Sequence, residues 1–433
     1  MSKLKLNLMG SGAVLGLVLG LHGSAFAQSS NNSEAVTRLD EIIVTARKRE
    51  ESLQETPLSI SAFTSNMIES AGIKDMTDIA KSTPGFSLDE DFSRASGIRP
   101  VIRGQSTILG ASGVSTFVDG ILLDGSILDY DFNDIERIEV IKGPQSALYG
   151  RNTYSGAINI ITKSPSDEAS GNVKLEAGSY GRVDLSGSMR GPISDVLSGG
   201  ITGRFYKRGG PWTNLYDGTR VGQQKSGSIS GVLYYEPNDD LSVRARVRLS
   251  KLDDDQLRNF NTQTSENNII PDIGGVYNGE NRYYRGEIVA HDINVDDARM
   301  LGEKGYDRVK SGQASLSINY KINENWTMEF INGITADKSD SKNDVGNTPD
   351  SLNPFSVYIG PVFPVFGPYW FHAYVTSGPL LDFALDSEGS SLDYSSELRF
   401  NYEGEKFNGL IGGYFYDGRD ESKGRRQPPP EFA

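Results

Sequence analysis

Residues 241–249 read Leu-Ser-Val-Arg-Ala-Arg-Val-Arg-Leu, so apolar and polar side chains alternate with a period of two. Successive side chains of a β-strand point to opposite faces of the sheet. The apolar residues therefore share one face, which could meet lipid, while Arg244, Arg246 and Arg248 share the other, which could not. This stretch predicts a strand that separates a hydrophobic environment from a polar one.

The same alternation recurs along the chain after residue 165, although any one such strand would also fit a soluble β-sandwich. Nine strands are predicted, at about 171–177, 182–190, 199–208, 225–236, 241–251, 308–321, 326–337, 391–402 and 407–417. Every second link between them is short, whereas 209–224, 252–307 and 338–390 are long. A meander through a membrane has tight periplasmic turns on one side and long outer loops on the other. The sequence therefore predicts an antiparallel transmembrane β-barrel over 166–433, with about nine strands present.

The region before these strands has a different, mixed pattern. Helices are predicted at 66–71 and 75–81, and strands at 101–103, 115–118, 135–141 and 157–162. A stretch of this length, rich in Val, Ile and Leu, can hold a small core of its own. We therefore expect a mixed α/β domain over 51–165.

The N-terminus combines a leader with a polar tail. Residues 1–27 have a charged start, an apolar centre and an Ala-Phe-Ala cleavage site, and so predict a secretory signal peptide. Residues 28–50 are predicted to form a flexible tail, interrupted by the β-branched segment from Glu41 through Ile42, Ile43, Val44 and Thr45 to Ala46. That segment could be an ordinary first strand, or it could pair with the exposed sheet edge of another protein.

Composition excludes several function classes. The formal net charge of −14 argues against nucleic-acid partners, because phosphate contacts are made by clustered Lys and Arg. The chain has no Cys and only three scattered His residues, so neither a thiolate site nor a metal or cofactor site is predicted. No catalytic motif occurs, so no enzyme is expected. Residues 253–255, three aspartates, are interpreted as a solvated loop start, with a calcium site as the alternative.

Several stretches of the α/β region resemble a known family. They are 57–60 (Pro-Leu-Ser-Ile), 102–104 (Ile-Arg-Gly), 118–120 (Val-Asp-Gly), 135–144 (Ile-Glu-Arg-Ile-Glu-Val-Ile-Lys-Gly-Pro), 146–150 and 156–162. Together they resemble the plug domain of TonB-dependent outer-membrane receptors. The segment 41–46 is similar to the TonB box of that family, which favours pairing with a partner over the ordinary-strand interpretation.

The resemblance implies a fold and a mechanism. The family's barrel has 22 strands around the plug, so nine strands imply an incomplete barrel, and we expect the chain to end in or near the fifth outer loop. The plug would face the periplasm of a Gram-negative cell, and TonB would pull on the TonB box to drive import. Arg103 and Arg137 match arginines that lock the plug to barrel glutamates, here expected beyond Ala433. The alternative for Arg137 is a solvated strand residue opposite Glu139.

The cargo is inferred from one predicted loop and from the family resemblance. The predicted outer loop 338–390 contains an aromatic cluster that could contact a ligand or simply pack on itself: Tyr358, Phe363, Phe366, Tyr369, Trp370 and Phe371. A ferric siderophore or other iron complex is expected because it is the family's commonest cargo, with cobalamin or an oligosaccharide as alternatives. A passive porin or adhesin is the rival class, and it would need neither a plug nor a TonB box.

Overall fold

The computed structural model describes residues 41–90, 98–105, 112–123, 130–165, 167–213, 218–255, 269–270, 283–284, 305–344 and 384–427. From Ile42 onward the chain forms one compact unit. Within the described ranges, no helix is both long enough and apolar enough to cross a membrane.

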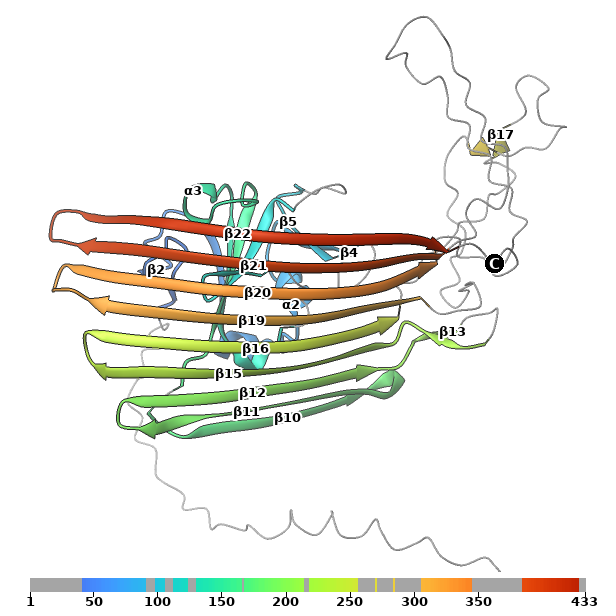
Figure 1. Ribbon diagram of the computed structural model, residues 1–433, viewed down its shortest axis with the longest axis horizontal. Coiled ribbons are helices and arrows are strands. Elements are labelled where there is room, and N and C mark those ends of the chain that lie inside the picture. Colours follow the sequence, from blue (N-terminus) through green and yellow to red (C-terminus); the bar gives the residue numbers. More distant parts are fainter. Residues whose placement is uncertain are drawn as a thin grey trace, which may run out of the picture. The chain divides into compact units, whose positions relative to one another are not determined.

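Nine antiparallel strands form one sheet in strict chain order, as Figure 1 shows. They are β10 (Ser170–Gly178), β11 (Arg182–Ser194), β12 (Leu197–Arg208), β15 (Gln224–Asn238), β16 (Leu241–Asp255), β19 (Tyr306–Lys321), β20 (Trp326–Asp344), β21 (Ala384–Glu403) and β22 (Asn408–Gln427). The predicted number and order are confirmed. Several strands extend well past their predicted outer ends, and β20 pairs with β21 as far as Asp344 and Ala384. The ladder can continue because main-chain hydrogen bonds do not require the apolar side chains from which the ends were predicted.

The two faces of the sheet differ as the sequence predicts. On β16, Val247 and Leu249 are 51% and 56% exposed, whereas Arg246 and Arg248 are 4% and 6% exposed. Residues 253–255 end β16 and are not a loop start, since all three pair with β19. In the part of the chain that the structure describes, no group of acidic or histidine side chains could hold a metal ion.

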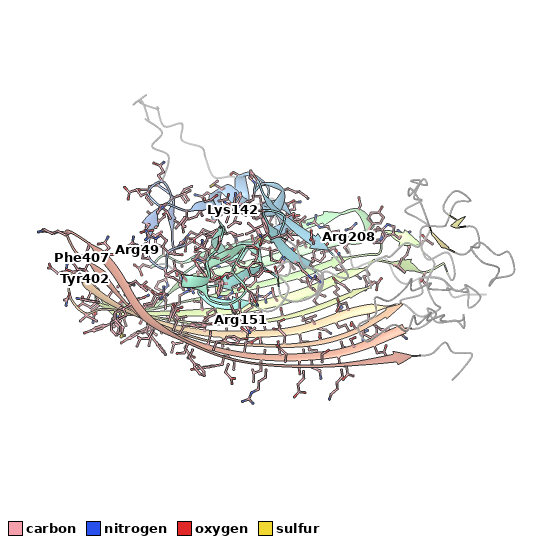
Figure 2. All side chains as sticks on the ribbon, turned by 90° about the horizontal axis from the view of Figure 1, so that it is seen from above. Arg49, Lys142, Arg151, Arg208, Tyr402 and Phe407 are labelled. Carbon is pink, nitrogen blue, oxygen red and sulfur yellow. The ribbon has the colours of Figure 1, made fainter. Side chains whose placement is uncertain are left out.

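Aromatic side chains gather at the ends of the strands that the short turns join. The rings of Trp326 and Tyr402 are 5.1 Å apart, and those of Tyr402 and Phe407 are 4.8 Å apart. Figure 2 labels Tyr402 and Phe407 at this end of the sheet. Such rings occupy the interface between membrane and water in outer-membrane strands.

The α/β domain is built on a five-stranded sheet in the order β3-β8-β9-β6-β7. These strands are β3 (Ser59–Thr64), β8 (Ile135–Lys142), β9 (Gly156–Thr162), β6 (Val114–Val118) and β7 (Ile121–Leu123), and only the pairing of β6 with β9 is parallel. Its core includes Ile79, Ile102, Ile135, Ile138 and Ile158, all fully buried.

Helices and short strands complete the domain. They are α1 (Ser65–Ser70), α2 (Met76–Lys81), α3 (Ser146–Tyr149), η2 (Phe132–Asp134) and the hairpin of β4 (Phe86–Glu90) and β5 (Ile98–Ile102). The two predicted helices are present within one residue of their expected limits. Helix α2 begins where it does because the Asp75 side chain accepts hydrogen bonds from the N–H groups of Thr77 and Asp78. Strands β3, β4 and β7 were not predicted, because alternating patterns this short cannot be distinguished from loop sequence.

The remaining elements are small. Strands β1 (Ile43–Val44) and β2 (Glu51–Ser52) pair near the N-terminal end of the described chain. Between the long strands lie β13 (Trp212–Thr213), β14 (Arg220–Val221), β17 (Ile269–Ile270), β18 (Tyr283–Tyr284) and the short helix η3 (Ser179–Gly181).

Candidate functional site

A buried carboxylate joins the α/β domain to the nine-stranded sheet. Asp134 ends the short helix η2, which Asp131 caps by accepting a 3.0 Å hydrogen bond from the N–H of Asn133. The Asp134 carboxylate receives hydrogen bonds from Arg190 at 2.8 Å and Arg246 at 2.7 Å, and the hydroxyl of Ser230 donates at 3.0 Å. Asp134 and Arg246 are each 4% exposed. Charged groups this deeply buried are tolerated only when they are paired, so the two parts are fastened here.

Tyr130 extends this contact. Its hydroxyl accepts a 3.0 Å hydrogen bond from Arg246, and the guanidinium of Arg248 lies 4.5 Å from the centre of its ring. Burial raises the pKa of the Tyr130 hydroxyl, and the charges of Arg246 and Arg248 oppose that rise only in part. The neutral phenol therefore bridges two arginines of β16 without adding a negative charge.

A second carboxylate makes an equivalent contact. Asp119 has a φ of 49° in the turn between β6 and β7, next to Gly120 with a φ of 84°. Its carboxylate lies 2.9 Å from Arg244 and accepts hydrogen bonds from the N–H and hydroxyl of Thr162 at 2.9 and 2.8 Å. Burial alone would raise the pKa of Asp119, but Arg244, Arg246 and the Thr162 N–H together hold it below its ordinary value. All three arginines that alternate along β16 thus contact the α/β domain.

The lowered pKa of Asp119 predicts a pH dependence. A carboxylate with a depressed folded-state pKa contributes stability that is complete above the unfolded value of about 3.9 and is lost as pH falls through the folded value. We expect Asp119→Asn to unfold more easily than the parent near pH 7, and the difference to shrink as pH falls below about 4. Urea unfolding at a series of pH values measures this. A difference that stays constant down to about pH 2 would contradict the ion pair.

The segment 41–46 lies against the α/β domain. Ile43 and Val44 pair with Ser52 and Glu51, and the Ile42 carbonyl accepts a 2.9 Å hydrogen bond from the N–H of Leu53. Val44 and Ala46 are 1% and 0% exposed, whereas Ile43 is 39% exposed and Glu41 is exposed. The segment therefore alternates between buried and accessible side chains.

Two anchors follow in the chain. The N–H of Thr45 donates a 2.8 Å hydrogen bond to the carboxylate of Glu139 on β8. The Lys48 ammonium lies 3.5 Å from Glu397 of β21 and 4.5 Å from the centre of the Tyr149 ring, and the Lys48 carbonyl accepts a 3.0 Å hydrogen bond from Arg399. Burial lowers the pKa of Lys48, and the Glu397 charge only partly offsets this. The segment is thus tied to both the α/β domain and the nine-stranded sheet.

Comparison with known proteins identifies this arrangement. The family model described as TonB-dependent Receptor Plug Domain matches residues 52–157. The α/β domain belongs to the TonB-dependent receptor plug domain family. The family comprises outer-membrane receptors and transporters and not enzymes, so the chain is an outer-membrane protein and its nine-stranded sheet is barrel wall.

Individual relatives agree with this assignment. The iron-regulated outer membrane virulence protein of Vibrio cholerae is 28% identical over 353 residues, which is 75% of this chain and 48% of that protein. The vitamin B12 transporter BtuB of Vibrio vulnificus is 33% identical over 153 residues, which is 34% of this chain and 25% of that protein. The ferric yersiniabactin uptake receptor FyuA of Yersinia pestis has the same fold, with a TM-score of 0.62 at 17% identity over 86% of this chain and 50% of that one. The chain thus spans about half the length of the Vibrio cholerae relative.

The two arginines that were expected to lock the plug to the barrel have different surroundings in the structure. Arg137 is bonded within the plug, 2.9 Å from both Glu136 and Glu139, with its side chain 13% exposed. Arg103 is exposed and has a φ of 54°, and its N–H donates a 2.7 Å hydrogen bond to the carbonyl of Gly85. Their lock with barrel glutamates stays a prediction. The contacts of Asp119 and Asp134 have the reverse polarity, with acids on the plug and arginines on the barrel. The sequence signal for them was the row of arginines in β16.

The ligand-binding prediction falls on residues that the structure does not describe. Tyr358, Phe363, Phe366, Tyr369, Trp370 and Phe371 all lie within 345–383, outside the described residues. The cluster therefore stays a prediction.

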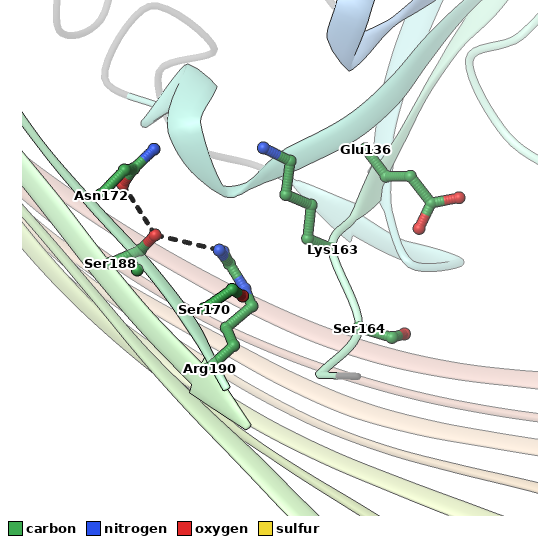
Figure 3. A pocket seen from close by; sticks show the side chains of 8 residues that line it. Glu136, Lys163, Ser164, Ser170, Asn172, Ser188 and Arg190 are labelled. Carbon is green, nitrogen blue, oxygen red and sulfur yellow. Dashed lines mark hydrogen bonds between the residues drawn. The ribbon is translucent and has the colours of Figure 1, made fainter. Parts of the chain in front are cut away.

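A polar pocket of about 330 Å³ lies where the plug meets the first barrel strands, as Figure 3 shows. Its lining includes Lys163 from the plug and Asn172, Ser188 and Arg190 from the barrel. The hydroxyl of Ser188 donates a 2.9 Å hydrogen bond to Asn172 and accepts a 3.0 Å bond from Arg190. Because Arg190 is also bonded to Asp134, this pocket borders the plug–barrel fastening.

Proposed function

We propose that this protein imports a scarce iron complex, of the ferric siderophore class, across the outer membrane, using energy that TonB delivers through the segment 41–46. The observation that carries the proposal is a folded plug, fastened to the inner face of a barrel wall by Asp119 and Asp134, with a strand-forming segment at its N-terminal end. A passive pore needs neither feature. An energised importer needs both, because something must block the lumen and something must be pulled.

The iron complex is favoured over cobalamin by the extent of the sequence similarity. The relative that is named as iron-regulated aligns with 75% of this chain, which takes in barrel strands as well as the plug. The vitamin B12 transporter aligns with 34%. Cobalamin is therefore the second candidate cargo, and an oligosaccharide the third. Other proposed partners are TonB and the lipid that surrounds the barrel.

The segment 41–46 supplies a specific test, Ile43→Pro in the complete gene. Proline has no N–H, so it removes a main-chain donor from the strand that TonB would bind. We expect iron-complex uptake under iron limitation to fall to the level of cells without TonB. Ile43→Val is the matched control, because it keeps both the N–H and the β-branched side chain.

The outcomes separate the parts of this proposal. Equal amounts of parent and variant in the outer membrane must be verified by immunoblot. If iron-complex uptake is absent from all strains but cobalamin uptake is lost with Ile43→Pro, the cargo is wrong and the energised mechanism stands. If a cargo enters the Ile43→Pro strain as fast as the parent, TonB coupling through this segment is wrong.

A further inference from the structure

The strand β1 has one edge paired and the other facing away from its partner. The Ile42 carbonyl bonds to Leu53, and Val44 pairs with Glu51. Hydrogen-bonding groups of an antiparallel strand alternate in direction, so those of Ile43 and Thr45 point away from β2. A strand added by a partner would have to use this second edge.

The second edge is already occupied at Thr45. The N–H of Thr45 donates to Glu139 at 2.8 Å, and the Thr45 carbonyl accepts from the N–H of Lys48 at 2.9 Å. Both main-chain groups that an incoming strand would need at this residue therefore have internal partners. The Glu139 carboxylate takes the position that a carbonyl of the added strand would take.

Glu139 is held in that position by its own neighbours. It is 0% exposed, and its carboxylate accepts hydrogen bonds from Arg137 at 2.9 Å and from Asn159 at 3.2 Å. A buried carboxylate with charge-assisted bonds keeps a fixed orientation. The side-chain hydroxyl of Thr45 joins the same cluster, because it accepts from Asn159 at 3.1 Å and from Arg137 at 3.4 Å and lies 3.2 Å from Glu139.

We propose that Glu139 is an internal competitor of the TonB strand, and that the Thr45 hydroxyl sets how tightly the TonB box is held against the plug. This inference rests on the proposed function, since it concerns how TonB gains access to the box. The docked state recognises Thr45 through its side chain as well as its main chain. Strand addition uses the main chain. A change confined to the hydroxyl therefore weakens docking and leaves the strand's capacity for pairing intact.

Thr45→Val makes that change, because valine keeps the shape and the β-branched stem but has no hydroxyl. Thr45→Ser is the matched control, since it keeps the hydroxyl. Docking is read out by alkylation of a cysteine that replaces Ala46, which is 0% exposed. The 433-residue sequence contains no Cys, and any Cys elsewhere in the complete receptor is replaced by Ser, so this thiol is the one labelled. The complete receptor is used in outer-membrane vesicles, with neither TonB nor ligand added.

We expect Thr45→Val to raise the alkylation rate about tenfold, the size that corresponds to losing hydrogen bonds with charged partners. Thr45→Ser should stay close to the Ala46→Cys parent. A purified periplasmic domain of TonB should bind the Thr45→Val receptor more tightly by a similar factor. An unchanged alkylation rate in Thr45→Val, or an equal rise in Thr45→Ser, overturns the role of the hydroxyl.

TonB binding distinguishes failure of this inference from failure of the proposed function. If TonB binds parent, Thr45→Val and Thr45→Ser with equal affinity while alkylation differs, the internal competition is wrong and the proposed function stands. If TonB binds none of them, the proposed function is wrong, and the competition fails with it.

Discussion

Asp134→Ala should lower the free energy of unfolding of the plug by about 3–5 kcal/mol. This is the range found when one partner of a buried ion pair is removed. The variant leaves Arg190 and Arg246 without their shared carboxylate, at side-chain exposures of 10% and 4%. Water cannot replace the lost partner at such exposures. The hydroxyl of Ser230 also loses its acceptor. The expected effect therefore combines an unpaired charge with an unsatisfied polar group.

The measurement is urea unfolding of the complete receptor in detergent, with protease cleavage within the plug as the readout. Glu136→Gln is the matched control, because Glu136 lies two residues away in sequence and its ion pair with Arg137 is 46% exposed on the Glu136 side. Exposed pairs contribute at most about 1 kcal/mol. If Asp134→Ala and Glu136→Gln shift the unfolding midpoint equally, Asp134 does not fasten the plug.

The sequence predicted one half of this contact and not the other. The row of Arg244, Arg246 and Arg248 had to face away from lipid, and it does. Its partners Asp119 and Asp134 were not predicted, because each lies more than a hundred residues earlier in the chain, in a turn or beside a short helix. A period-two pattern determines which side chains of a strand lie on the same face of the sheet. Which residues pack against that face depends on the tertiary structure. The family resemblance directed attention to Arg103 and Arg137 instead.

The β-branched pattern of segment 41–46 and its resemblance to a TonB box could be recognised in the sequence, but the docking of this segment could not. Thr45 and Glu139 are 94 residues apart, and nothing local in 41–46 indicates which carboxylate it meets. In the same way, strand ends predicted from apolar alternation stopped short of Asp344 in β20, where the ladder continues through polar residues. An alternating pattern indicates which side chains are buried. Main-chain pairing between strands does not depend on it and continues past the last apolar residue.

Gly156→Ala should destabilise the plug by about 3 kcal/mol, the upper end of the usual range for overpacking. Gly156 begins β9 and pairs with Lys142 of β8. A Cβ there would lie 2.4 Å from the carbonyl oxygen of Ile141 and 2.6 Å from the Cδ1 atom of Ile102. The first of these atoms is main chain in a paired strand and cannot rotate away, so β8 and β9 must separate. This is a packing reason for the glycine in 156–162, one of the stretches that carries the family resemblance.

Urea unfolding again provides the measurement, with Gly409→Ala as control because a Cβ at Gly409 meets nothing within 4 Å. The control should stay within about 0.5 kcal/mol of the parent. Asn159 lies three residues along β9 and holds both Thr45 and Glu139, so movement of this strand also disturbs the docked segment 41–46. Gly156→Ala should therefore raise alkylation of a cysteine at position 46, although it touches no residue of the segment 41–46. A destabilised plug with an unchanged alkylation rate would show that β9 does not carry the docking contact.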